Sequence, residues 1–74
     1  MELKVKLSAR NTLKGKIVDI KMGQTTAHIK LDIGGGNVIT ASITNEAVEE
    51  LNLKVGDQAW GVVKASDVMI AKEA

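Results

Sequence analysis

The sequence contains no cysteine and no proline, and Trp60 is its only aromatic side chain and His28 its only histidine. Without cysteine no disulfide can form, and a single histidine argues against a structural transition-metal site. A chain of 74 residues buries only about 60% of the surface of its unfolded form, so one small core gives marginal stability. With disulfides and metals set aside, we expect a homo-oligomer.

The shortage of aromatic residues and of net charge also bears on partners. The net charge is +1, which provides no broad electrostatic surface for nucleic acid, and single-strand binders normally stack bases on several aromatic side chains. No run approaches the roughly 18 apolar residues of a membrane helix. Glu2, Lys4 and Lys6 interrupt any apolar run that could act as a signal peptide. We expect a cytoplasmic protein with neither a nucleic-acid nor a membrane partner.

Alternation of apolar and polar residues predicts several short strands. The clearest runs from Thr25 to Ile33. Gly34, Gly35, Gly36 and Asn37 follow it, and because these residues tolerate positive φ they predict a hairpin. The predicted strands are Leu3–Leu7, Leu13–Met22, Thr25–Ile33, Val38–Thr44, Ala59–Lys64 and Asp67–Ala71.

Two further features shape the predicted fold. The alternation in Leu13–Met22 changes phase beside Gly15, which indicates a bulge or a strong bend. A helix is expected at Asn45–Leu51, with Thr44 or Asn45 as its N-cap. This order predicts one all-β domain over residues 1–74, a five-stranded OB-type Greek-key barrel with one short helix between strands 3 and 4. An SH3-like barrel is the competing topology, and neither fold fixes a function.

Enzymatic interpretations find little support. There is no cysteine nucleophile, and no Asp–His pair accompanies a serine. His28 lies on the polar face of a predicted strand, where a solvated histidine is the simpler interpretation. The glycine triplet joins two strands and is not followed by the helix of a phosphate-binding loop. We therefore expect a protein that is not an enzyme and carries no cofactor.

Two polar clusters suit a small anion. Ser8-Ala9-Arg10-Asn11 precedes the first barrel strand and contains the only arginine, and Lys64-Ala65-Ser66 follows the fourth. With Thr44 at a helix start, the clusters offer hydroxyls, cations and backbone N–H groups. The alternative is that they are ordinary polar residues at strand ends, and the residues alone leave both interpretations open.

The segments SARN, TLKGKIV, IGGGNVITASIT, NEAVEELNLKVG and VVKASDVMI together resemble molbindin, the Mop or TOBE-type domain that binds molybdate. The resemblance runs from Leu7 to about Ala71. It implies an OB-type barrel, a hexamer built as a trimer of dimers, and molybdate or tungstate held at subunit interfaces. Isolated domains of this length resemble members that store or buffer the oxyanion for molybdenum-cofactor synthesis.

The resemblance also assigns residues to the site. It places Ser8, Arg10 and the backbone N–H of Ala9 on the oxyanion, with Thr44 and Lys64 contributed by a different subunit. At Ala47, where relatives often carry serine, only a backbone N–H remains. Arg10 and Lys64 would balance the two charges of molybdate, whereas partly protonated phosphate would need an acceptor that this set lacks.

Two alternatives to a storage protein remain at this stage. One is an OB-type nucleic-acid-binding module. The other is a regulatory, ligand-sensing domain of a molybdate transporter or transcription regulator, because longer relatives carry the domain on such proteins.

Overall fold

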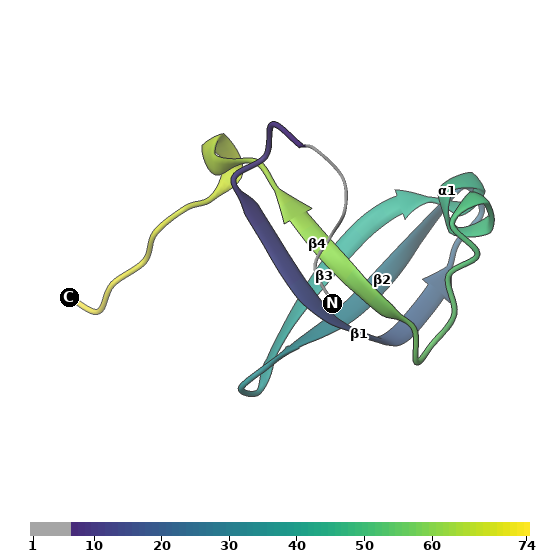
Figure 1. Ribbon diagram of the computed structural model, residues 1–74, viewed down its shortest axis with the longest axis horizontal. Coiled ribbons are helices and arrows are strands. Elements are labelled where there is room, and N and C mark those ends of the chain that lie inside the picture. The colour runs from purple at the N-terminus through teal and green to yellow at the C-terminus, as the bar shows by residue number, and fades with distance from the viewer. Residues whose placement is uncertain (1–6) are drawn as a thin grey trace.

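A computed structural model describes residues 7–74 of the chain. Its elements follow the expected order of three strands, one helix and a further strand (Figure 1). The elements are β1 (Asn11–Met22), β2 (Thr26–Gly34), β3 (Asn37–Thr44), α1 (Asn45–Glu50), β4 (Gln58–Val63) and the 3-10 turn η1 (Ala65–Asp67). The all-β class and the helix after the third strand are therefore confirmed. Of the expected strand Leu3–Leu7, residues 3–6 lie outside the described residues, and Leu7 belongs to no strand.

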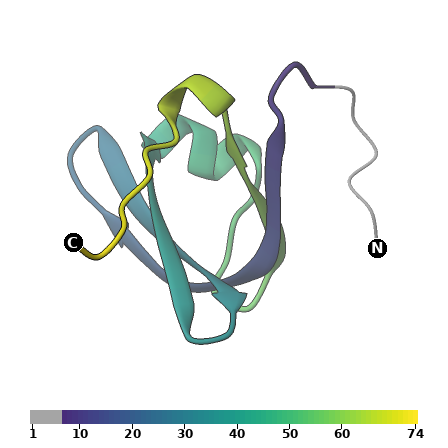
Figure 2. The same cartoon turned by 90° about the vertical axis from the view of Figure 1, so that its left-hand side faces the viewer.

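The strands form one antiparallel sheet in the order β3-β2-β1-β4. The sheet curls into an open half-barrel, with α1 at one end (Figure 2). The long strand β1 is the reason for the curl. Its first half pairs with β4 and its second half with β2, and the two pairings overlap at Lys16, which is opposite both Gln58 and Asp32.

The bend in β1 has two sources. The register with β2 shifts between Ile17 and Asp19, so the bulge lies at Val18 and not beside Gly15 as expected. Gly15 has another role, because a Cβ at this position would collide with the backbone of Asp32 and the side chain of Leu31. Gly15 therefore lets β1 pass close to β2 where the strand changes partner.

The core is small and lies inside the curl. In β2 the alternation predicted from the sequence is present, because Ala27, Ile29 and Leu31 are buried while the residues between them are exposed. Ile17 of β1 and Val48 of α1 complete the buried set of five among the described residues. The β2–β3 hairpin turns through Gly34, Gly35 and Gly36, whose φ angles are 96°, 63° and 80°, as the glycine triplet predicted.

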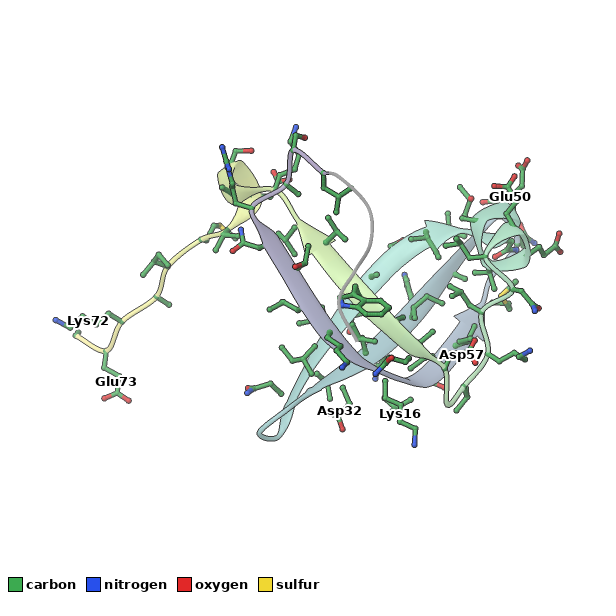
Figure 3. The ribbon with its side chains drawn as sticks, viewed as in Figure 1. Lys16, Asp32, Glu50, Asp57, Lys72 and Glu73 are labelled. Atoms are coloured by element: carbon green, nitrogen blue, oxygen red, sulfur yellow. The ribbon has the colours of Figure 1, made fainter. Side chains whose placement is uncertain are left out.

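The expected fifth strand, Asp67–Ala71, is wrong for this structure, which has four strands among residues 7–74. Asp67 N–H donates to the Lys64 carbonyl at 2.9 Å and Val68 N–H to the Ala65 carbonyl at 3.3 Å. These bonds form η1 and turn the chain away from the sheet. The residues from Val68 onward form no strand and no helix, and Figure 3 shows Lys72 and Glu73 far from the half-barrel. As a result β3 and β4 remain the two edges of the sheet.

Candidate functional site

The first polar cluster lies where β1 begins and β4 ends. Asn11 is opposite Val63 in the sheet, and Asn11 Nδ2 donates to the Val63 carbonyl at 3.3 Å. Arg10 comes directly before Asn11 and Lys64 directly after Val63, so the register brings the two cations to the same end of one chain (Figure 1). Sequence reasoning included Asn11 in this cluster but did not foresee that its side chain joins the two segments.

The side chains at this end are open to a ligand. Ser8, Arg10 and Lys64 are exposed, and Ala9 is half-buried. Lys64 is also the N-cap residue of η1, and its carbonyl accepts the Asp67 N–H bond that closes this turn. The same turn contains one carboxylate, Asp67, which neither predicted cluster included.

The second polar group lies at the start of α1. Thr44 is the N-cap of the helix, and its Oγ1 accepts a hydrogen bond from Ala47 N–H at 3.0 Å. In this structure the cap uses the Ala47 N–H, and the contact of Ala47 with the oxyanion stays a prediction. The Thr44 hydroxyl still has its own hydrogen to donate, since accepting a bond uses only an oxygen lone pair.

Asn45 fixes the position of the start of α1, which we call the Thr44 end of the molecule. Sequence reasoning missed this role. Asn45 Nδ2 donates to the carbonyls of Gly23 and Gln24 at 3.0 and 3.2 Å, and the Asn45 backbone N–H donates to the Thr25 carbonyl at 2.9 Å. These bonds hold the first residue of α1 on the turn between β1 and β2. The signal in the sequence was an asparagine at a helix start, which suggested only a cap.

The two polar groups lie at opposite ends of the molecule. Thr44 is opposite Thr26, at the end of the sheet where Met22 closes β1. Arg10 precedes the other end of β1, a strand of 12 residues, and Figure 1 shows the turn after β4 well separated from α1. The expectation grouped Lys64 with Thr44 on one subunit, but the register groups Lys64 with Arg10 instead. One chain therefore does not bring both halves of the expected site together.

Other candidate sites carry little chemistry. His28 is exposed on β2, as expected, and the acids of α1 are exposed too, with Glu50 pointing outward in Figure 3. Within residues 7–74, no group of three or more histidine or acidic side chains could hold a metal. The same residues include no helix long and apolar enough to cross a membrane.

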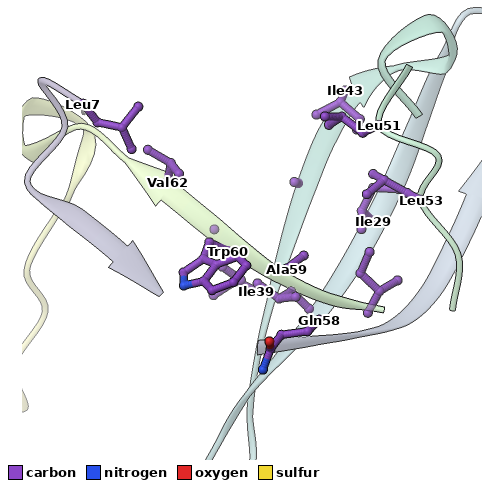
Figure 4. A pocket seen from close by; sticks show the side chains of 14 residues that line it. Leu7, Ile29, Ile39, Ile43, Leu51, Leu53, Gln58, Ala59, Trp60 and Val62 are labelled. Carbon is purple, nitrogen blue, oxygen red and sulfur yellow. The ribbon is translucent and has the colours of Figure 1, made fainter. Parts of the chain in front are cut away.

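An apolar groove of about 430 Å³ lies inside the half-barrel. It lies between β3, β4 and the segment that leaves α1 (Figure 4). Ile39 and Ile43 line it from β3, and Trp60 and Val62 from β4. Because this groove offers almost no donors, it does not suit an oxyanion.

Comparison with known proteins agrees with this fold and with these motifs. Residues 7–70 match the TOBE domain family. A probable molybdenum-pterin-binding protein from Haemophilus influenzae is 49% identical over 69 residues, which are 93% of this chain and 100% of the relative.

Two solved structures share the fold. A molybdate-binding protein from Sporomusa ovata superposes with a TM-score of 0.86 at 34% identity, over 92% of this chain and 100% of its own. The cytoplasmic molybdate-binding protein ModG, crystallised with molybdate bound, gives a TM-score of 0.85 at 45% identity, over 89% of this chain and 47% of ModG. The resemblance inferred from the SARN and KAS segments is thereby confirmed, and the chain belongs to the TOBE domain family.

Proposed function

We propose that this chain binds molybdate or tungstate and catalyses no reaction. The observation that carries the proposal is the pairing of Asn11 with Val63, which brings Arg10 and Lys64 to one end of the sheet. Two solved proteins with this fold and similar sequences are described as molybdate-binding proteins, and one of them was crystallised with molybdate bound.

The chemistry of this end suits a tetrahedral dianion. Arg10 and Lys64 supply two positive charges, and the guanidinium of Arg10 is a fixed fork of donors that stays charged at any physiological pH. Ser8 adds a hydroxyl and Ala9 a backbone N–H. A hydrogen bond to a charged group contributes about 1.5–3 kcal/mol, so a few such bonds hold a dianion once water is excluded.

Water is excluded when a second copy of the chain covers this end. The Thr44 end of the second copy would then supply the Thr44 hydroxyl and the first turn of α1, with Ala47 at its surface. This arrangement keeps all six expected residues in the site but divides them differently: Ser8, Ala9, Arg10 and Lys64 from one copy, Thr44 and Ala47 from the other.

An oligomer is also what the surface of the half-barrel favours. The core is small, and large apolar side chains of β1 and β4 remain exposed: Leu13, Val18, Met22 and Val62. Several large apolar side chains exposed on so small a chain favour contact with another protein surface. A homohexamer, arranged as a trimer of dimers, satisfies the proposal, since each chain then offers both of its ends to neighbours.

The proposed biological role is storage. The chain would buffer the oxyanion in the cytoplasm and release it for molybdenum-cofactor synthesis. One feature supports this role over a regulatory one: the H. influenzae relative, which is matched over its whole length, consists of this domain alone. A cytoplasmic location is supported by ModG, which is described as cytoplasmic.

Isothermal titration calorimetry tests the proposal. Molybdate and tungstate should bind the oligomer, phosphate should bind more weakly because Arg10 and Lys64 are donors only and cannot accept its proton, and single-stranded DNA should not bind. Native mass spectrometry with and without molybdate then gives the number of subunits and of bound anions together. Binding of oligonucleotide without binding of molybdate would overturn the proposal in favour of a nucleic-acid-binding module.

A further inference from the structure

Asn45, the first residue of α1, bonds to three successive carbonyl groups of the turn between β1 and β2. Its Nδ2 donates to the Gly23 and Gln24 carbonyls at 3.0 and 3.2 Å, and its backbone N–H donates to the Thr25 carbonyl at 2.9 Å. Within the turn itself, Gly23 N–H donates to the Thr26 carbonyl at 2.8 Å. The turn is therefore held largely from outside, by one residue at the start of the helix.

The oxygen of the same Asn45 side chain makes no bond. Oδ1 is buried and has no hydrogen-bond partner among the described residues. Turning the amide over would set Oδ1 against the two carbonyl oxygens that Nδ2 now bonds, so the bonds of Nδ2 fix its orientation. A buried acceptor without a partner costs stability, and local costs of this kind are expected at functional sites. The unpaired Oδ1 therefore favours a role in function for the Nδ2 bonds.

The bonds of Asn45 act on Thr44, the residue directly before it. Thr44 is opposite Thr26 in the β2–β3 register, and its Oγ1 accepts the Ala47 N–H at 3.0 Å. The sheet thus holds the Thr44 backbone on one side and Asn45 holds it on the other. Without the two Nδ2 bonds, a single backbone bond would tie Asn45 to the turn, and the Thr44 hydroxyl would be held less firmly.

We infer that Asn45 is a positioning residue for the oxyanion site. It holds the Thr44 hydroxyl where an anion bound at the Arg10 end of a second copy accepts its hydrogen, without touching the anion itself. The inference rests on the proposed function. No other role of the molecule requires the start of α1 to be fixed on the turn by side-chain bonds as well as by the backbone bond.

Replacement of Asn45 gives the first test. Asn45→Ala keeps the backbone bond to Thr25 and loses both Nδ2 bonds, so molybdate binding should weaken about 2- to 12-fold, the equivalent of one ordinary hydrogen bond. The matched control is Asn37→Ala, which removes the same kind of bond, Nδ2 to the Gly34 carbonyl at 3.2 Å, in the β2–β3 hairpin. This control should bind molybdate like the natural chain.

A mixing experiment separates positioning from a general loss of stability. Arg10→Glu disables the Arg10 end of a chain, and Ala47→Glu disables its Thr44 end. When the two variants are co-expressed, a working site joins the Arg10 end of the Ala47→Glu chain to the Thr44 end of the Arg10→Glu chain. Asn45→Ala is added to the Arg10→Glu chain in one mixture and to the Ala47→Glu chain in another. Both mixtures contain the same substitutions, so the total cost in stability is the same.

Calorimetric titration with molybdate compares the two mixtures. The working sites should be about 2- to 12-fold weaker when Asn45→Ala lies in the Arg10→Glu chain, and should have natural affinity when it lies in the Ala47→Glu chain. Equal affinities in the two mixtures would overturn the role of Asn45. The mixture without Asn45→Ala tests the proposed function separately, because a lack of working sites there would overturn the two-copy site itself.

A measurement on the unsubstituted chain covers the case in which Asn45→Ala does not fold. In isotope-labelled protein studied by NMR, the Nδ2 hydrogens of Asn45 should exchange with solvent more slowly once molybdate is bound, because the anion then holds the Thr44 end. The Nδ2 hydrogens of Asn37 should exchange at an unchanged rate. Exchange at Asn45 that does not respond to molybdate would contradict the inference.

Discussion

Asn11 and Val63 face each other at the open end of the sheet, and the side-chain amide of Asn11 donates to the Val63 carbonyl at 3.3 Å. This bond joins the first residue of β1 to the last residue of β4. This bond matters for the proposed site because Arg10 directly precedes Asn11 and Lys64 directly follows Val63. The spacing of the two cations is thus set by a hydrogen bond between neighbours of the site.

Replacement of Asn11 should therefore weaken anion binding without removing any group that touches the anion. We expect Asn11→Ala to lower the free energy of unfolding by about 1 kcal/mol and to weaken molybdate binding several-fold. The matched control is Asn37→Ala, which removes a similar bond, Asn37 Nδ2 to the Gly34 carbonyl at 3.2 Å, in the β2–β3 hairpin. Calorimetric titration and thermal unfolding of both variants check this, and equal affinities in the two variants would exclude a positioning role for Asn11.

Loss of either cation should have a larger effect on binding and almost none on folding. Both Arg10 and Lys64 are exposed, so each substitution by alanine should leave the melting temperature nearly unchanged. Each should weaken molybdate binding about 10- to 150-fold, the range that follows from a hydrogen bond to a charged group. Lys30→Ala, an exposed lysine in the middle of β2, removes the same charge at a distance and should bind like the natural chain. An unchanged affinity for Arg10→Ala would remove Arg10 from the site.

Gly15 should be essential for the fold and not for the chemistry. A methyl group at this position has no room beside the Asp32 backbone and the Leu31 side chain. We expect Gly15→Ala to destabilise the protein by about 1–3 kcal/mol, the usual effect of overpacking, which thermal or denaturant unfolding measures. Lys14→Ala, at the neighbouring exposed position, should change stability by no more than about 0.5 kcal/mol. If both variants unfolded at the same temperature, the close approach of β1 to β2 would be wrong.

Local pattern was enough to predict much of the fold. The alternation in β2, the glycine hairpin and the N-cap at Thr44 each follow from residues close together in sequence, and the structure has all three. The prediction of a fifth strand is wrong for this structure because the segment pairs with neither edge of its own sheet. The sequence of Asp67–Ala71 shows a strand-like composition, but it does not show that the bonds of η1 direct the segment away from its own sheet.

The sequence indicates candidate residues for the site but not how the fold groups them. The residue types and the resemblance to molbindin pointed to Arg10, Lys64 and Thr44. Their grouping depends on which strands are neighbours, and that follows from the β1–β4 pairing between residues about 50 positions apart. The use of the Ala47 N–H by the Thr44 cap is likewise a matter of side-chain geometry, which spacing alone does not show.

The central claim is that each oxyanion site combines the Arg10 end of one copy with the Thr44 end of another. Mixing two inactive variants tests it most directly. Arg10→Glu and Ala47→Glu each place a carboxylate at one half of the site, and a glutamate in the first turn of α1 suits the helix dipole, so the fold should survive. Each variant alone should lose molybdate binding.

Co-expression of the two variants should then restore sites that contain neither substitution. If chains of the two kinds assemble at random in a symmetric homo-oligomer, about one quarter of the sites should recover full affinity, and native mass spectrometry or calorimetric titration counts them. A mixed assembly with no recovered site, or an Ala47→Glu protein that binds molybdate as well as the natural chain, would contradict a site built from two copies.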